Sequence, residues 1–277
     1  MRIIKFGNFY YFAYIIIAFL LVLLTIRFLK NKPNRYKHYF LFSIYLVAFV
    51  IHFLKVFIYP YNTLNIVYHK MTLENVSAVS TVFFPWIYLS KNKVLKDYLV
   101  IGGISSGILP FLFPIDAMIP MFDGNYLPIK HALSLEVIRF YFAHLVLLLV
   151  PIVMMHYKMH RISVKRILYM PVILMVILTI LFINEWAITQ IGWVSSTDFL
   201  NPLKRNPSLI FGLKDGLSGL GVFIALFVPK VFTIHPVTGA LFYWPVVWLI
   251  FPVFIYGTII SFIYALIYDR EESIKII

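Results

Sequence analysis

Seven long apolar runs limit what this chain can fold into, and they lie near residues 9–28, 38–59, 72–89, 97–113, 134–155, 167–188 and 243–267. A helix needs roughly 20 apolar residues to cross a lipid bilayer, because it rises only about 1.5 Å per residue. Inside the hydrocarbon, a helix also satisfies its backbone hydrogen bonds within one segment. The runs therefore predict an all-α fold, a polytopic transmembrane helical bundle of about seven spans.

The charge content supports the same class of protein. Only 13% of the residues are charged, whereas a soluble domain carries roughly 25%. Most of the outer surface must therefore face something other than water. The run at 9–28 is longer than the apolar core of a signal peptide and lacks a small-residue cleavage site, so we predict that it is a span. We expect a single transmembrane domain over residues 1–277, a multi-pass protein of the cell membrane.

Basic residues indicate how the spans are oriented. They gather in three short segments between runs, as Lys30, Lys32, Arg35 and Lys37, then Lys91, Lys93 and Lys96, then Lys158, Arg161, Lys165 and Arg166. Because basic loops remain in the cytoplasm, the N-terminus is predicted outside and the C-terminus cytoplasmic. Segment 189–242 is then an extracytoplasmic loop. Its apolar stretch 217–228 is short and rich in glycine, which favours a re-entrant or interface-lying segment over an eighth span.

Several classes of chemistry find no support in the residues. The chain has no cysteine, so disulfides and thiolate sites are excluded. Its net charge of +13 lies mostly in short loops, which argues against nucleic-acid binding. No P-loop, G-x-S-x-G or HExxH motif is present, and we expect no cofactor. His156 and His160 have the spacing of metal ligands but lie in a basic loop, so no metal site is predicted.

A small set of polar and ionisable residues interrupts the apolar runs, and its members are His52, Lys55, Glu74, Arg139, His144, Asn184 and Glu185. With the predicted orientation, all of them lie in the outer half of the bilayer. Ionisable groups in hydrocarbon are costly and usually face a bundle interior, a partner or a water-filled cavity. The pattern therefore predicts a polar cavity that opens to the outside.

Simpler interpretations exist for single members of this set. Lys55 and Arg139 can extend to the lipid headgroups, and Glu136 has the helical spacing to pair with Arg139. Glu74 and Glu185 lie near the predicted membrane surface, where water can reach them. His144 is different, because its short side chain lies too deep in its run to reach the headgroups. It is the strongest single candidate for a functional residue.

The arrangement resembles the YwaF-like bacterial membrane proteins, which are related to a eukaryotic transmembrane acyltransferase that remodels ether-linked phospholipids. The matching pieces are residues 72–79, Phe84-Pro85, 91–93, Gly102-Gly103, 142–145 with Pro151, Asn184 and Trp244-Pro245. Relatives typically carry a histidine and a cysteine at the start of the third span. Those positions are Thr72 and Glu74 here, so His144 is the half of the catalytic pair that carries over.

The resemblance implies a lipid-binding or lipid-modifying protein, with acyl transfer or ester hydrolysis as the reaction. In that case His144 is the general base, and Glu74 orients it or activates a hydroxyl such as Thr72. Arg139 or Lys55 would hold a phosphate. The remaining substrate-binding candidates are His52, Asn184 and Glu185, and the expected partners are membrane lipids.

Two other classes of protein fit the same pattern. One is the solute-binding subunit of a transporter or a small permease, with a small polar solute as its ligand. The other is a non-catalytic structural protein of the membrane. The composition does not distinguish these classes, because each requires only a polar site within an apolar bundle.

Overall fold

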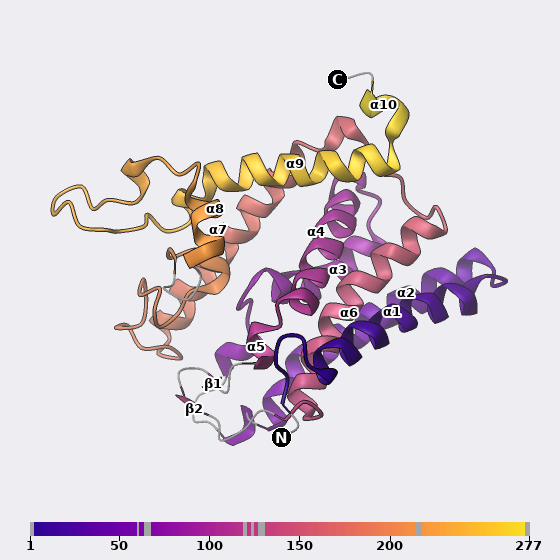
Figure 1. The fold of residues 1–277 in the computed structure, drawn as a ribbon, viewed down its shortest axis with the longest axis horizontal. Coiled ribbons are helices and arrows are strands. Elements are labelled where there is room, and N and C mark those ends of the chain that lie inside the picture. The colour runs from indigo at the N-terminus through magenta and orange to yellow at the C-terminus, as the bar shows by residue number, and fades with distance from the viewer. Residues whose placement is uncertain are drawn as a thin grey trace. The chain divides into compact units, whose positions relative to one another are not determined.

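The computed structural model describes residues 3–59, 61–63, 68–118, 121–122, 125–126, 131–213 and 218–274. Nearly all of its regular structure is helical, as Figure 1 shows. The exceptions within these residues are strands β1 (Met121–Phe122) and β2 (Asn125–Tyr126) and one bridge between Ile234 and Leu241. The prediction of an all-α fold is confirmed.

The long helices follow the apolar runs, and they are α1 (Phe9–Leu29), α2 (Asn34–Leu54), α3 (Val76–Leu89), α4 (Lys93–Leu112), α6 (Leu135–His156), α7 (Tyr169–Gln190) and α9 (Ile250–Tyr268). Short helices are α5 (Ile115–Met118), α8 (Ser218–Ala225) and α10 (Arg270–Ile274). Six helical segments are long and apolar enough to cross a membrane, which supports a multi-pass membrane protein. Helix α3, with 14 residues, is apolar but shorter. The number of spans and their orientation remain predictions.

Polar side chains at the start of several helices determine where those helices begin. Asn8, Asn92 and Ser134 each accept a hydrogen bond from a backbone N–H in the first turn of α1, α4 and α6. Such caps satisfy amide groups that have no partner within the helix. Helix α9 begins at Ile250 rather than near 243, because Val246 has a φ of 64°, which no helix accommodates. Helix α3 begins only at Val76, after a 3-10 turn over Tyr68–Met71.

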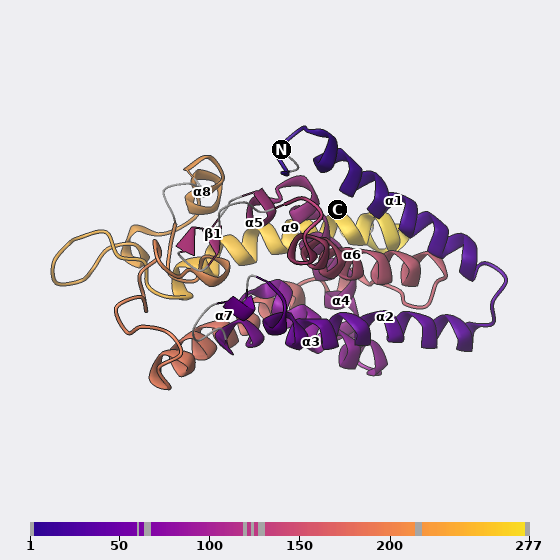
Figure 2. The ribbon, with the colours of Figure 1, turned by 90° about the horizontal axis from the view of Figure 1, so that it is seen from below.

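The chain forms two compact units. The first comprises Met1–Val67 and Ser80–Arg161. In it, α6 contacts both α1 and α2 and lies between them in Figure 2. Its closest neighbour is α4. A Cβ atom on Gly103 would lie 2.8 Å from the Leu147 carbonyl oxygen, and one on Gly107 would lie 2.9 Å from the His144 carbonyl oxygen. These two glycines therefore allow the α4 backbone to approach the α6 turns that carry His144.

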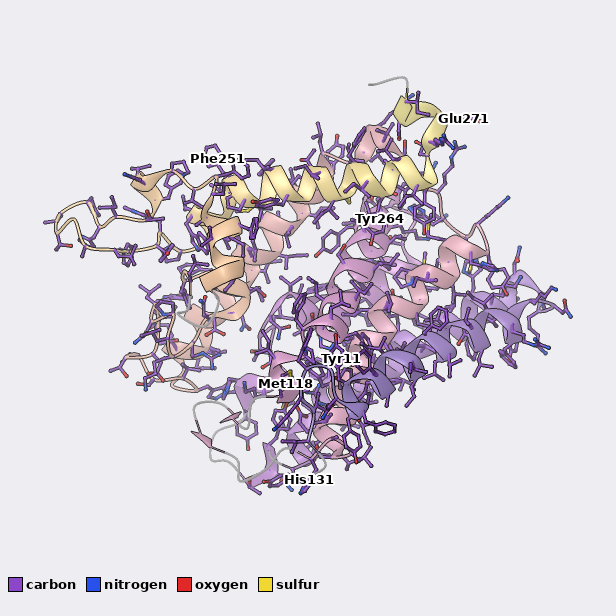
Figure 3. All side chains as sticks on the ribbon, in the orientation of Figure 1. Tyr11, Met118, His131, Phe251, Tyr264 and Glu271 are labelled. Carbon is purple, nitrogen blue, oxygen red and sulfur yellow. The ribbon has the colours of Figure 1, made fainter. Side chains whose placement is uncertain are left out.

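The second unit comprises Tyr68–Val79 and Ile162–Ile277. Its helices α7 and α9 meet where Gly257 approaches Pro171, and Figure 3 labels Phe251 and Tyr264 along α9. The predicted extracytoplasmic segment 189–242 contains α8, which has eight residues. That length spans only about 12 Å, too little to cross a bilayer. Residue 217, the first of the apolar stretch 217–228, lies outside the described residues.

Candidate functional site

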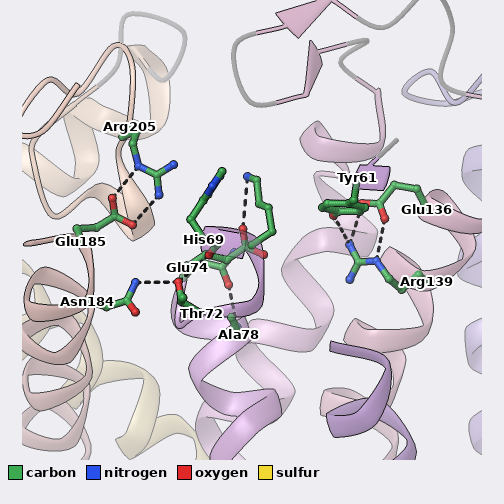
Figure 4. Close-up of polar contacts among 12 residues, drawn as sticks. Tyr61, His69, Thr72, Glu74, Ala78, Glu136, Arg139, Asn184, Glu185 and Arg205 are labelled. Carbon is green, nitrogen blue, oxygen red and sulfur yellow. Dashed lines mark hydrogen bonds and ion pairs between the residues drawn. The ribbon is translucent and has the colours of Figure 1, made fainter. Parts of the chain in front are cut away.

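Arg139 forms the centre of a polar cluster in the first unit. Its Nε and Nη2 atoms donate to the two carboxylate oxygens of Glu136, each at 2.8 Å, and Nη2 also donates to the Tyr61 hydroxyl at 3.0 Å. The Tyr61 hydroxyl donates in turn to Glu136 Oε1 at 2.8 Å (Figure 4). We call Tyr61, Glu136 and Arg139 the Arg139 cluster. Spacing of three residues on α6 places the acid and the base on one face, as the simpler interpretation of this pair expected.

Lys55 also lies near the ring of Tyr61. Its ammonium lies 5.9 Å from the centre of the Tyr61 ring, and the Arg139 guanidinium lies 5.7 Å from it. Lys55 is only 2% exposed, so its charge is inside the protein rather than extended to a lipid surface. Cations at this distance from an aromatic ring are attracted to its electron-rich face. His52, one helical turn earlier, is also buried and packs its ring against Phe53.

His144 is positioned by its own helix. Its Nδ1 atom lies 2.8 Å from the carbonyl oxygen of Phe140, and the two rings are 4.6 Å apart. Because a carbonyl oxygen only accepts, Nδ1 must carry the hydrogen. In the neutral imidazole, Nε2 then has a free lone pair. The hydroxyl of Tyr141, one turn earlier on α6, is buried and has no hydrogen-bond partner within the described part of the chain.

Glu185 makes a buried ion pair in the second unit. Its two carboxylate oxygens accept from Nε and Nη2 of Arg205 at 2.7 and 2.8 Å. The side chain of Glu185 is 1% exposed and that of Arg205 13%. Glu185 lies on α7, whereas Arg205 lies in the irregular segment that follows it. The pair therefore ties that segment to the end of the helix, with a planar two-bond geometry that favours strong binding.

Thr72 and Asn184 meet in the same unit. Asn184 Nδ2 donates to the Thr72 hydroxyl at 3.1 Å, and that hydroxyl donates to the His69 carbonyl at 2.6 Å. Glu74 lies two residues further along and forms an ion pair with Lys70 at 3.4 Å. The segment before α3 is thus held by side-chain contacts on both sides of Thr72, which Figure 4 shows together with the Glu185 pair.

The segment after Arg205 also fixes the start of α3. The Ser208 hydroxyl accepts a hydrogen bond from the backbone N–H of Val76 at 3.0 Å, and Asn75 accepts from Ala78 at 2.8 Å. Both bonds satisfy amides of the first helical turn. Ser208 therefore caps a helix that lies more than a hundred residues earlier in the sequence, a role that no local pattern indicates.

The structure distributes the predicted site residues between the two units. His52, Lys55, Arg139 and His144 lie in the first, and Glu74, Asn184 and Glu185 lie in the second. Sequence reasoning missed the roles of two residues, Tyr61 and Arg205. The sequence contains one indication that Arg205 has a role, since a basic residue fits poorly in a segment predicted to lie outside the cell. It contains none for Tyr61.

The histidines with metal-like spacing have other surroundings. His160 Nε2 lies 2.6 Å from Asp97 Oδ1, and both side chains are buried. His156, at the end of α6, is exposed. Across the described ranges, no three His, Asp or Glu side chains gather into a group suited to a metal ion. The Asp97–His160 pair instead connects α4 to the loop that follows α6 within the first unit.

Comparison with known proteins assigns the chain to a family. A model of the TMEM164 family matches residues 5–229. This range contains the Arg139 cluster, His144, the Glu185–Arg205 pair and Thr72, and it ends before α9. The comparisons with curated proteins and with solved structures gave no match.

Proposed function

This chain belongs to the TMEM164 family, a family of transmembrane proteins, and we propose that it modifies membrane lipids, by acyl transfer or ester hydrolysis, with His144 as the general base. The family match supports a membrane-embedded protein, and the lipid chemistry comes from the resemblance to the eukaryotic acyltransferase. We also propose that the chain is related to the YwaF-like bacterial proteins and that it has a polar cavity that opens to the outside.

The observation that carries the proposal is the hydrogen bond between His144 Nδ1 and the Phe140 carbonyl. It fixes the ring and its tautomer, so that Nε2 of the neutral imidazole is a proton acceptor. Nε2 would take the proton of an acceptor hydroxyl, either water or a lysophospholipid. The hydroxyl oxygen would then attack an acyl ester carbonyl, and the proton would pass from Nε2 to the departing alkoxide.

Charge near Tyr61 supports an anionic lipid headgroup as the substrate. Lys55 and Arg139 place two cations against the Tyr61 ring, and Glu136 supplies one carboxylate. Guanidinium and ammonium groups are common ligands of phosphate oxygens. His52 lies one turn before Lys55 and would contribute to the same substrate contacts.

Glu74 and Thr72 would have a supporting role in the second unit. Thr72 already donates its hydroxyl hydrogen to the His69 carbonyl and accepts from Asn184. Its activation as a nucleophile would require that first bond to break. We therefore assign the acceptor hydroxyl to water or lipid, with Glu74 orienting polar groups rather than forming an acyl intermediate. Glu185 and Asn184 would fix the surrounding segments.

The experiment compares the lipids of cells with the wild-type chain, with a deletion, and with His144→Ala or His156→Gln. We expect the deletion and His144→Ala to change the acyl-chain composition alike, as measured by mass spectrometry. In vesicles that contain the purified protein, His144→Ala should slow acyl transfer from a labelled phospholipid by about 100-fold or more, since a general base contributes a rate acceleration of that size. His156→Gln is the matched control, because His156 is an exposed histidine on the same helix. Unchanged lipids with His144→Ala would contradict the proposal.

Transport of a small polar solute has weaker support. Glu185 accepts both hydrogen bonds of Arg205, and Asn184 donates to Thr72. These polar atoms are committed inside the second unit rather than presented to a ligand. Saturable uptake of a solute that is lost with Glu185→Ala, combined with unchanged lipids, would reverse this preference.

A further inference from the structure

Residues 218–244, which we call the α8 segment, expose large apolar side chains although they are not part of a candidate span. Val222, Phe223 and Leu226 on α8 are each about two-thirds exposed, at 67%, 66% and 65%. Beyond the helix, Val237 and Leu241 are 87% and 75% exposed. Large apolar side chains that gather at the surface mark a site of contact with a partner or a membrane.

Contacts with α9 indicate how deep this segment lies. The Tyr256 hydroxyl donates to the Phe223 carbonyl, and the rings of Phe227 and Tyr256 are 5.7 Å apart. Tyr256 lies six residues after Ile250, the first residue of α9. At about 1.5 Å per residue, Tyr256 is roughly 9 Å along the helix. If α9 enters the bilayer at its first turn, α8 lies at the level of the upper acyl chains.

The backbone of α8 is suited to that depth. A helix end leaves carbonyl groups without partners, and in a lipid environment each such group is costly. The Phe223 carbonyl accepts from Tyr256 and from the Leu226 N–H. The Ala225 carbonyl accepts from the Val228 N–H at 3.0 Å. Protein groups thus satisfy two of the carbonyls at the end of this short helix, those of Phe223 and Ala225.

The remainder of the segment forms a closed turn with an apolar tip. His235 and Ala240 are joined by a backbone hydrogen bond of 2.9 Å, and Ile234 pairs with Leu241. The His235 Nδ1 atom accepts from the backbone N–H groups of Val237 and Thr238 at 3.2 Å. This bonding holds Val237 at the end of the turn, where its side chain is almost fully exposed.

Charge distribution distinguishes a lipid surface from a protein partner. The sequence contains no Asp or Glu between residues 216 and 268, and Lys230 is its one Lys or Arg there. Exposed Lys230 and Trp244 lie on either side of the turn, residue types that favour the headgroup region. On α9, Phe251 and Phe254 are also exposed, and the Phe251 ring lies 6.2 Å from the ring of Phe232 in the α8 segment. Lipid that contacts α9 can therefore contact α8 as well.

We propose that the α8 segment is embedded in the membrane leaflet that surrounds the start of α9. Val222, Phe223 and Leu226 contact acyl chains, Val237 inserts at the tip of the turn, and Lys230 contacts lipid phosphates. The occupant of this surface is phospholipid. This placement does not depend on the lipid chemistry assigned to His144.

The absence of cysteine allows a direct test, because each introduced cysteine is unique. Val222→Cys, Leu226→Cys and Val237→Cys would carry a fluorophore in vesicles of phosphatidylcholine and phosphatidylglycerol that contain a doxyl-labelled lipid. Ile263→Cys on α9 is the lipid-exposed control, and Ser196→Cys, exposed in the polar part of the preceding segment, is the aqueous control. All five positions are exposed, so the folded chain should tolerate each change.

We expect the doxyl lipid to quench the Val222, Leu226 and Val237 labels as strongly as the Ile263 label. A membrane-impermeant thiol reagent should react with them as slowly as with Ile263→Cys. Quenching and reactivity equal to those of Ser196→Cys would overturn the proposal. A second measurement would attach a spin label to Val222→Cys. Strong coupling between the labels of two chains, without quenching of the fluorophore by lipid, would also overturn the proposal and would identify a second copy of the chain as the occupant.

Discussion

Two arginine–carboxylate pairs of this protein have the same chemistry but different origins. Arg139 meets Glu136 on the same helix, three residues away. Arg205 meets Glu185 across 20 residues, from an irregular segment to a helix. In each pair, the guanidinium makes two hydrogen bonds to one carboxylate, at 2.7 to 2.8 Å. The first pair follows from helical spacing, whereas the second exists only because the chain folds back on α7.

The pairs also differ in what remains when the arginine is removed. Glu136 retains the Tyr61 hydroxyl and lies in the first turn of α6, where the helix dipole favours a negative charge. Glu185 lies near the opposite end of α7, where the dipole is unfavourable to an anion. Arg205 supplies both of the hydrogen bonds described for its carboxylate. The distant pair should therefore contribute more to stability than the local one.

The largest expected effect is that of Arg205→Ala. It leaves a carboxylate that is 1% exposed without its cation, and breaking a buried pair typically costs about 3–5 kcal/mol. Unfolding of the purified protein in detergent would measure the loss. Lys204→Ala is the matched control, since Lys204 is the exposed neighbour, and it should change stability by less than about 0.5 kcal/mol. Equal effects of the two substitutions would show that the Glu185–Arg205 pair contributes little to the free energy of unfolding.

Arg139→Ala should have a smaller effect, about 1–3 kcal/mol, the usual cost of leaving a buried polar group short of a partner. Glu136 keeps one hydrogen bond and the helix dipole, which limits the loss. Arg139→Lys retains the charge but not the two-bond geometry, and should lie between the wild type and Arg139→Ala. The same unfolding measurement applies. A loss larger than that of Arg205→Ala would reverse the comparison of the two pairs.

Tyr61→Phe should have the smallest effect of the three, about 1 kcal/mol, because it removes one hydroxyl and keeps the ring. The ring contacts of Lys55 and Arg139 should persist in the variant, since they depend on the aromatic face. Unfolding of Tyr61→Phe, Arg139→Ala and the double variant would measure how strongly the two residues are coupled. Additive effects would mean that the hydroxyl and the guanidinium act independently, contrary to the geometry.

The apolar runs predicted the positions of the long helices but not all of their ends. The run at 72–89 becomes helical only at Val76, and the run near 243 only at Ile250. Hydropathy reports which residues avoid water, and it does not distinguish a helix from an apolar turn. Ser208 and Val246 illustrate what it omits, since one caps α3 from a distant segment and the other interrupts the backbone before α9.

The sequence by itself determined an all-helical membrane protein and the ionisable residues that interrupt its apolar runs. Both follow from local properties, since hydropathy and helical spacing depend only on neighbouring residues. Through helical spacing, it also indicated the Glu136–Arg139 pair. Only the tertiary structure assigned Arg205 to Glu185, Tyr61 to Arg139 and Tyr256 to α8. Those partners are distant in sequence, and the folded chain brings them together to satisfy polar groups that it removes from water.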